Sequence, residues 1–110
     1  MTDITIVNTN SAPQPLGHYS QAVKGGGLIH ISGQLPIKVD AQGIYEAAPF
    51  AEQVDQVLGN LLAILNAAGA SPDNVLKVTA YIVGVDQWGV FNAAFSRAFG
   101  SAKPARSVVP

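Results

Sequence analysis

Cysteine is absent from this sequence of 110 residues, so disulfides, thiolate nucleophiles and thiolate metal ligands are all excluded. Charged residues are also scarce, at 12% of the chain against roughly 25% in an average globular protein. The six basic residues are scattered and form no stripe, which argues against strong binding of nucleic acid. Hydrophobic residues reach 48%. A small domain of this composition would expose much apolar surface, so we expect it to associate with copies of itself.

Long apolar runs and targeting signals are missing as well. No apolar stretch approaches the ~18 residues that a membrane-spanning helix needs. The first residues lack the basic and apolar regions of a signal peptide. We therefore expect a single domain over residues 1–110, located in the cytoplasm.

The pattern of apolar residues predicts an α+β fold, in which two helices cover one face of a mixed β-sheet. Three glycines at 25–27 separate two apolar runs and indicate a hairpin turn. An apolar stripe that includes Val54, Leu58 and Leu65 predicts a helix over 50–68 that is followed by Gly69, with Asn60 off the stripe. Asp86 is the expected N-cap of a second helix, which has an aromatic stripe. Strands are expected at 4–7, 19–24, 28–34, 75–85 and 105–109, and a short one near 44–45 is left open.

Arg106 is the residue most suited to ligand binding. Neither His18 nor His30 has a carboxylate or cysteine at a motif spacing, so no catalytic triad or metal site is indicated. Pro104 fixes the entry of the last strand, which presents the Arg106 guanidinium from a rigid element. That arrangement suits bidentate hydrogen bonding to a carboxylate. The alternative is an ordinary surface arginine at a strand end.

Four segments, in order, resemble the RidA (YjgF) family of reactive-intermediate imine/enamine deaminases. The family's G-x-Y-x-Q-[AG]-V and S-G-Q-[IL]-P motifs are matched by GHYSQAV at 17–23 and by SGQLP at 32–36. Its [VF]-N-x-x-[YF] helix and P-A-R-[ST] signature are matched by FNAAF at 91–95 and by PARS at 104–107. Each short motif alone is weak, but the ordered set spans most of the chain.

The resemblance implies a chorismate-mutase-like α+β fold that forms a homotrimer, with ligand clefts between subunits. It also implies hydrolysis of 2-imino acids, or their 2-enamino tautomers, to 2-keto acids and ammonia. The activity would be that of a 2-iminobutanoate/2-iminopropanoate-type deaminase, and no cofactor or metal is implied. Such substrates arise from pyridoxal-phosphate enzymes such as threonine dehydratase.

The resemblance also assigns roles to individual residues. Arg106 would clamp the substrate carboxylate and so orient the neighbouring C=N carbon. Tyr19 would line the cleft and hydrogen-bond the ligand or a water. The other residues assigned to the substrate site are Ser32, Gly33, Asn92, Ser107 and Val108.

The sequence departs from the family pattern in two places. Many relatives have cysteine at the position of Val108, so a main-chain role there is retained while any thiol property is lost. Relatives also carry a further strand with an I-E-[IV]-E-A-like segment, whose glutamate is proposed to position the attacking water. This sequence stops at Pro110, before that strand. We therefore expect the natural chain to continue by roughly 15–25 residues, and the activity of this exact chain depends on that segment.

Two other functions remain open at this point. The same fold could serve as a non-catalytic trimer that binds or senses small metabolites, since Arg106 suits carboxylate binding in either case. An RNase or translation inhibitor, an activity ascribed to some relatives, is less favoured because the basic residues are scattered and lack exposed aromatic partners.

Overall fold

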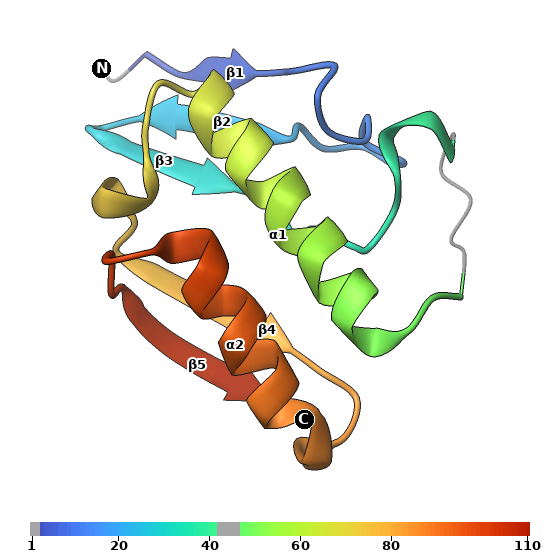
Figure 1. The fold of residues 1–110 in the computed structure, drawn as a ribbon. Helices are drawn as coiled ribbons and strands as arrows, with labels where there is room; N and C mark the ends of the chain where they lie inside the picture. Colours follow the sequence, from blue (N-terminus) through green and yellow to red (C-terminus); the bar gives the residue numbers. More distant parts are fainter. Residues whose placement is uncertain (1–2, 42–46) are drawn as a thin grey trace.

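The computed structural model describes residues 3–41 and 47–110 (Figure 1). The order of elements is the predicted β-β-β-α-β-α-β. The strands are β1 (Thr5–Val7), β2 (Ala22–Gly25), β3 (Leu28–Ile31), β4 (Lys77–Tyr81) and β5 (Ala105–Val109). The α-helices are α1 (Phe50–Ala67) and α2 (Trp88–Phe99), and short 3-10 turns lie at Val39–Ala41, Pro72–Asn74 and Val85–Gln87. The strand left open near 44–45 lies outside the described residues.

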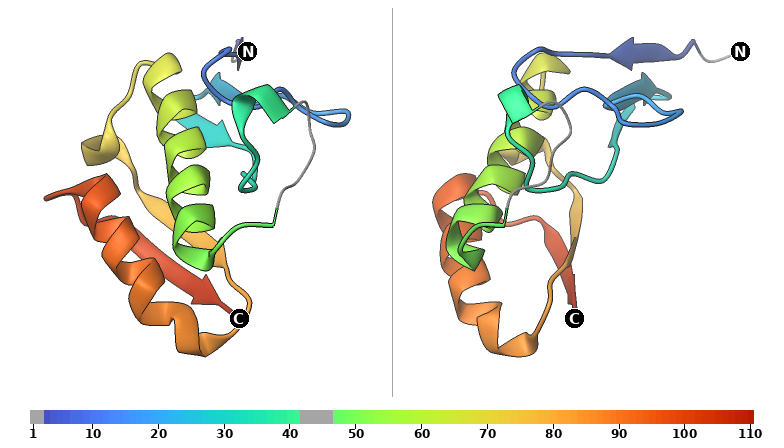
Figure 2. Two further views of the ribbon diagram at one scale, coloured as in Figure 1. Left: turned by 45° about the vertical axis from the view of Figure 1, so that its right-hand side comes forward. Right: turned by 90° about the vertical axis from the view of Figure 1, so that its right-hand side faces the viewer.

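The strands form one layer and the helices another, as Figure 2 shows, so the expected α+β class is confirmed. Strands β1, β2 and β3 pair antiparallel in that order. The expected hairpin turn joins β2 to β3, where Gly26 and Gly27 have φ of 60° and 80°. Strand β5 runs parallel to β4, and α2 forms the crossover between them. Among the described residues the strands therefore divide into two sheets, whereas a single mixed sheet was expected.

The helix layer packs on the two sheets through two apolar clusters. The larger cluster joins α1 to α2 and includes Val54, Leu58 and the aromatic stripe Phe91, Phe95 and Phe99. The smaller cluster joins α1 to β1 and β2. Each fully buried side chain of this size stabilises the fold by about 1.5–3 kcal/mol. Three members of the predicted aromatic stripe thus form core, whereas its first member, Trp88, is 50% exposed.

The chain leaves β4 and enters α2 differently from the prediction. The apolar alternation continues to Val85, but β4 is paired with β5 as far as Tyr81, and Ile82 N donates to Val109 O. Gly84, at φ 85°, then turns the chain out of the extended conformation. A 3-10 turn follows, and the N-cap of α2 is Gln87, without a side-chain cap. The prediction of Asp86 as N-cap was therefore wrong.

Helix α1 has the predicted bounds to within one residue, but one of its faces was misjudged. Asn60 was placed off the apolar stripe, yet it is 1% exposed. The loop around Leu35 and Ile37 covers this side of α1 and accepts hydrogen bonds from the Asn60 amide. At the far end, Lys24 Nζ donates to Ala68 O at 2.9 Å, which stabilises the carboxyl terminus of the helix.

Among the described residues, the sheet face that points away from the helices carries several exposed apolar side chains, interspersed with polar ones such as Lys77 and Thr79. Strand alternation directs Ile4 and Ile6 outward from β1, and Tyr81 and Val83 outward from β4 and the chain after it. Their exposed fractions are 71%, 67%, 79% and 92%. Large apolar side chains that are exposed to this degree are candidates for contact with another subunit. Within the described residues, no helix is long and apolar enough to span a membrane.

Candidate functional site

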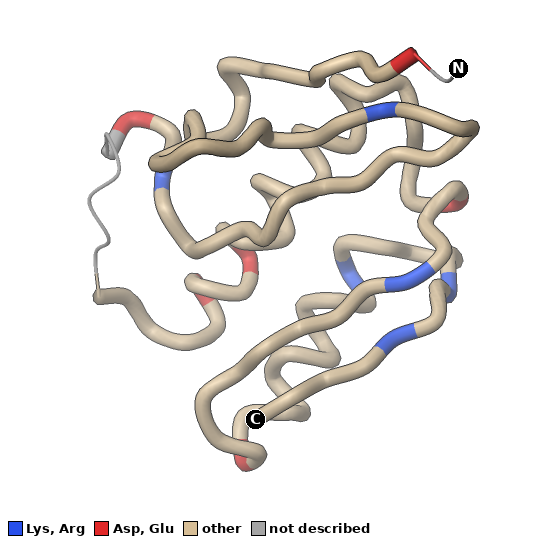
Figure 3. The backbone as a smooth tube through the Cα atoms, turned by 180° about the vertical axis from the view of Figure 1, so that it is seen from behind, with Lys and Arg blue, Asp and Glu red and all other residues tan. Residues whose placement is uncertain are grey.

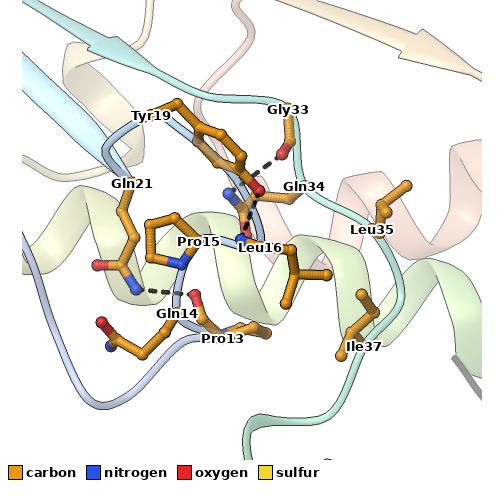
Figure 4. A pocket seen from close by; sticks show the side chains of 10 residues that line it. All are labelled: Pro13, Gln14, Pro15, Leu16, Tyr19, Gln21, Gly33, Gln34, Leu35 and Ile37. Atoms are coloured by element: carbon orange, nitrogen blue, oxygen red, sulfur yellow. Dashed lines mark hydrogen bonds between the residues drawn. The ribbon is translucent and has the colours of Figure 1, made fainter. Parts of the chain in front are cut away.

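A shallow pocket opens beside the ends of β2 and β3, between two loops (Figure 4). The Tyr19 ring lies across one side, and its hydroxyl accepts a hydrogen bond from Leu16 N at 3.2 Å. The cavity volume is about 40 Å³, room for water or a very small group. The residues that line it are Pro13, Gln14, Pro15, Leu16, Tyr19, Gln21, Gly33, Gln34, Leu35 and Ile37.

One wall of this pocket is held by Gln21, which is 1% exposed. Its Oε1 accepts from Thr9 N at 2.7 Å, and its Nε2 donates to Thr9 O and Pro13 O at 3.1 and 2.9 Å. A buried amide that makes all of these bonds holds the loop in place, although the loop is not paired with a strand. This explains why Tyr19 and Gln21 line the pocket, and why β2 begins at Ala22 instead of the predicted Tyr19.

Ser32 and Gly33 form the start of the opposite wall. Ser32 Oγ donates to Ser20 O at 2.6 Å, and Ser32 N donates to Gln21 O, so the two loops are joined at their base. Gly33 lines the pocket itself. The structure thus brings Tyr19, Ser32 and Gly33 close together. The Ser32 hydroxyl is engaged in the hydrogen bond that joins the two loops.

Arg106 lies on β5 and faces α2. Its guanidinium carbon is 4.8 Å from the Phe95 ring centre, 5.6 Å from Phe91 and 5.9 Å from Trp88. Its Nη1 donates to Asn92 Oδ1 at 3.0 Å. These contacts arise because α2 places aromatic side chains every three or four residues above the strand. Asn92 was expected to hold neighbouring groups in place, and the group that it contacts is the Arg106 side chain.

Positive charge gathers around the starts of β4 and β5, as Figure 3 shows. The one salt bridge among the described residues joins Arg97 to Asp55 at 3.5 Å on the surface. Arg106 accordingly has no carboxylate partner in that part of the chain, and most of its N–H donors remain free for one. The described residues also contain no cluster of three metal-ligating side chains. An unpaired guanidinium on an aromatic surface is a suitable site for an organic anion.

Ser107 and Val108 lie on the same strand but point in opposite directions. The Ser107 side chain is exposed on the outer face, whereas Val108 packs against the core. Ala105 N and Val109 O bond toward β4, so strand alternation directs the Arg106 and Val108 main-chain groups to the free edge. The Val108 amide is therefore available to a ligand, as its expected main-chain role requires.

Within one chain, the predicted site residues form two separate groups. Tyr19, Ser32 and Gly33 lie at the three-stranded sheet, whereas the Arg106 side chain contacts α2. The sequence-based assignment missed the loop at 13–16 and the buried amides Gln21 and Asn60. The two prolines at 13 and 15 were the signal for a rigid loop.

Comparison with known proteins gives consistent matches over nearly the whole chain. Residues 9–110 match the family model described as endoribonuclease L-PSP. The chain is 40% identical to a RutC family protein of Pyrococcus abyssi over 104 residues, which are 94% of this chain and 81% of that protein.

Two further relatives are informative about small-molecule chemistry. A 2-iminobutanoate/2-iminopropanoate deaminase of Dermatophagoides farinae is 34% identical over 109 residues, covering 99% of this chain and 84% of that protein. The crystal structure of Escherichia coli TdcF with bound serine has a TM-score of 0.86 at 30% identity, covering 96% of this chain and 84% of that one.

Proposed function

The chain belongs to the RidA (YjgF) family, and from this premise we propose that it hydrolyses 2-imino acids and their 2-enamino tautomers. In the reaction, water adds to the C=N carbon and the C–N bond breaks. The products are a 2-keto acid and ammonia, and no electrons are transferred. We place the reaction in the cytoplasm, and 2-iminobutanoate and 2-iminopropanoate are the proposed substrates.

The observation that carries the proposal is the environment of Arg106. Its guanidinium lies 4.8 Å from the Phe95 ring centre and is held by Asn92, with no carboxylate partner among the described residues. A 2-imino acid offers a carboxylate directly beside the reacting carbon. Two parallel bonds from the guanidinium to that carboxylate would fix the carbon in one orientation. The Val108 amide at the free edge of β5 would donate to the same ligand.

The separation of Tyr19 from Arg106 favours a cleft formed between subunits. We propose a homotrimer in which the Tyr19 loop of one copy faces the Arg106 strand of the next. Support comes from the exposed outer face of the sheets, where Tyr81 and Val83 are 79% and 92% exposed. Association would cover this face and join the two groups of site residues.

The direct test is turnover of an imino acid made in place. Threonine dehydratase generates 2-iminobutanoate, and semicarbazide traps the fraction that has not been hydrolysed. Adding this protein should lower semicarbazone formation in proportion to its concentration. Unchanged trapping, with binding of 2-oxobutanoate retained, would indicate the metabolite-binding alternative. Cleavage of single-stranded RNA in a parallel incubation would instead support a nuclease.

Tyr19→Phe is expected to lower turnover by about 2- to 10-fold. The substitution removes one hydrogen bond to Leu16 N, worth about 0.5–1.5 kcal/mol, and any bond from the hydroxyl to the ligand or a water. The ring itself remains, so the pocket keeps its shape. Steady-state rates from the trapping assay measure the effect. A complete loss of activity in Tyr19→Phe would show that the hydroxyl takes part in the chemistry.

A further inference from the structure

The wall of the pocket opposite Tyr19 is tied to helix α1 by one buried amide. Asn60 Nδ2 donates to Leu35 O at 3.1 Å and to Ile37 O at 2.9 Å. Its Oδ1 accepts from Gln56 Nε2 at 2.9 Å, so the donor and acceptor groups of the amide are all in use. Leu35 and Ile37 line the pocket, whereas Asn60 does not.

The burial of Ile37, which is 5% exposed, also supports this wall, but few other hydrogen bonds do. Among the described residues, the remaining hydrogen bonds of segment 33–37 join residues one or two positions apart, such as Ile37 N to Leu35 O and Gln34 Nε2 to Ser32 O. Such local bonds shape the loop but do not locate it relative to the rest of the fold. Asn60 does locate it, because its two donors reach residues 25 and 23 positions earlier in the chain.

We propose that Asn60 is a positioning residue of the Tyr19 pocket, which forms one side of the proposed cleft between subunits, acting through the carbonyls of Leu35 and Ile37. The inference rests on the proposed function and names a residue that sets how well the pocket binds. A buried amide is costly unless it is fully bonded, and its bonds are directional. A leucine there would fill the space but would leave two carbonyls without donors. The wall would then shift relative to Tyr19 while the core stayed intact.

The experiment compares Asn60→Leu with Leu58→Ala on the same helix. Leu58 is 5% exposed and packs toward α2, so its truncation destabilises the fold without touching the wall. Asn60→Leu should raise KM for 2-iminobutanoate by about 10-fold and change kcat by less than about 3-fold. Amide hydrogen exchange in segment 33–37 should also become faster. Leu58→Ala should lower Tm but leave KM and the exchange of this segment unchanged.

Two further variants keep the result decisive. Asn60→Ser retains one short donor without added bulk and covers the case in which Asn60→Leu does not fold. Asn60→Gln retains the amide and should recover part of the lost affinity. An unchanged KM with unchanged exchange in both Asn60→Leu and Asn60→Ser would overturn the inference, as would an equal rise in KM in Leu58→Ala. If the wild-type protein has no deaminase activity, the proposed function fails, and exchange at 33–37 alone decides the role of Asn60.

Discussion

Replacing Arg106 by alanine is expected to lower kcat/KM for a 2-imino acid by roughly 30- to 1000-fold. Losing a charge-assisted, bidentate hydrogen bond in a partly desolvated site weakens transition-state binding by about 2–4 kcal/mol. The aromatic surface around the guanidinium makes it such a site, with ring centres at 4.8–5.9 Å. Arg106→Lys should recover only part of the rate, because an ammonium cannot reproduce the planar fork.

Arg97→Ala is the matched control for this prediction. Arg97 has one surface contact, to Asp55 at 3.5 Å, and its side chain is 64% exposed. Its removal should leave turnover unchanged, because exposed ion pairs contribute little. Tm should be measured for both variants, since Arg106→Ala also loses its contacts with α2. If Arg106→Ala kept the wild-type rate while Tyr19→Phe abolished it, the carboxylate anchor would have been assigned to the wrong residue.

Tyr81→Asp is expected to convert a trimer into monomers and to abolish turnover with it. Tyr81 is 79% exposed on the outer face of β4, the face proposed to lie between subunits. Burying a carboxylate there without a partner costs several kcal/mol, enough to prevent association at micromolar concentration. Light scattering should report about three times the 11.4 kDa chain mass for the wild type and about one times for the variant. Activity should fall because a complete site would require the Tyr19 loop of one copy and the Arg106 strand of another.

Ala51→Asp adds the same charge on the helix layer and serves as the control. Ala51 is exposed in the first turn of α1, where a negative charge is favourable. This variant should remain trimeric and active. A wild-type protein that is monomeric at micromolar concentration, yet fully active, would show that the site is complete within one chain.

The elements that could be predicted from the sequence are those whose signals are local. Helix α1 begins at Phe50, as predicted, because an apolar stripe over many turns is a long, redundant signal. The hairpin follows from glycines that adopt positive φ, and β5 follows from a short β-branched run after Pro104. The family motifs likewise singled out Tyr19 and Arg106 without any knowledge of where they lie.

The errors share a different cause, which is contact between segments distant in the sequence. Asn60 is polar, so periodicity placed it on the solvent side, but a loop some 25 residues earlier covers it and uses its amide. Residues 19–21 have strand-like composition, yet Gln21 bonds to Thr9 and Pro13 and holds them in a loop. Asp86 has a good capping side chain, but the turn after Gly84 moved the helix start beyond it.

The sequence by itself determined the α+β class, the order of elements and the family, because periodicity, turn glycines and ordered motifs are properties of short segments. It also identified Arg106 as an anion-binding candidate from its residue type and its place after Pro104. Only the tertiary structure decided that Arg106 lies against Phe95 and Asn92, that Asn60 holds the pocket wall, and that Tyr19 lies apart from Arg106 within one chain. These facts depend on how sheets and helices pack together, and packing is fixed by contacts between residues far apart in the sequence, which no local pattern encodes.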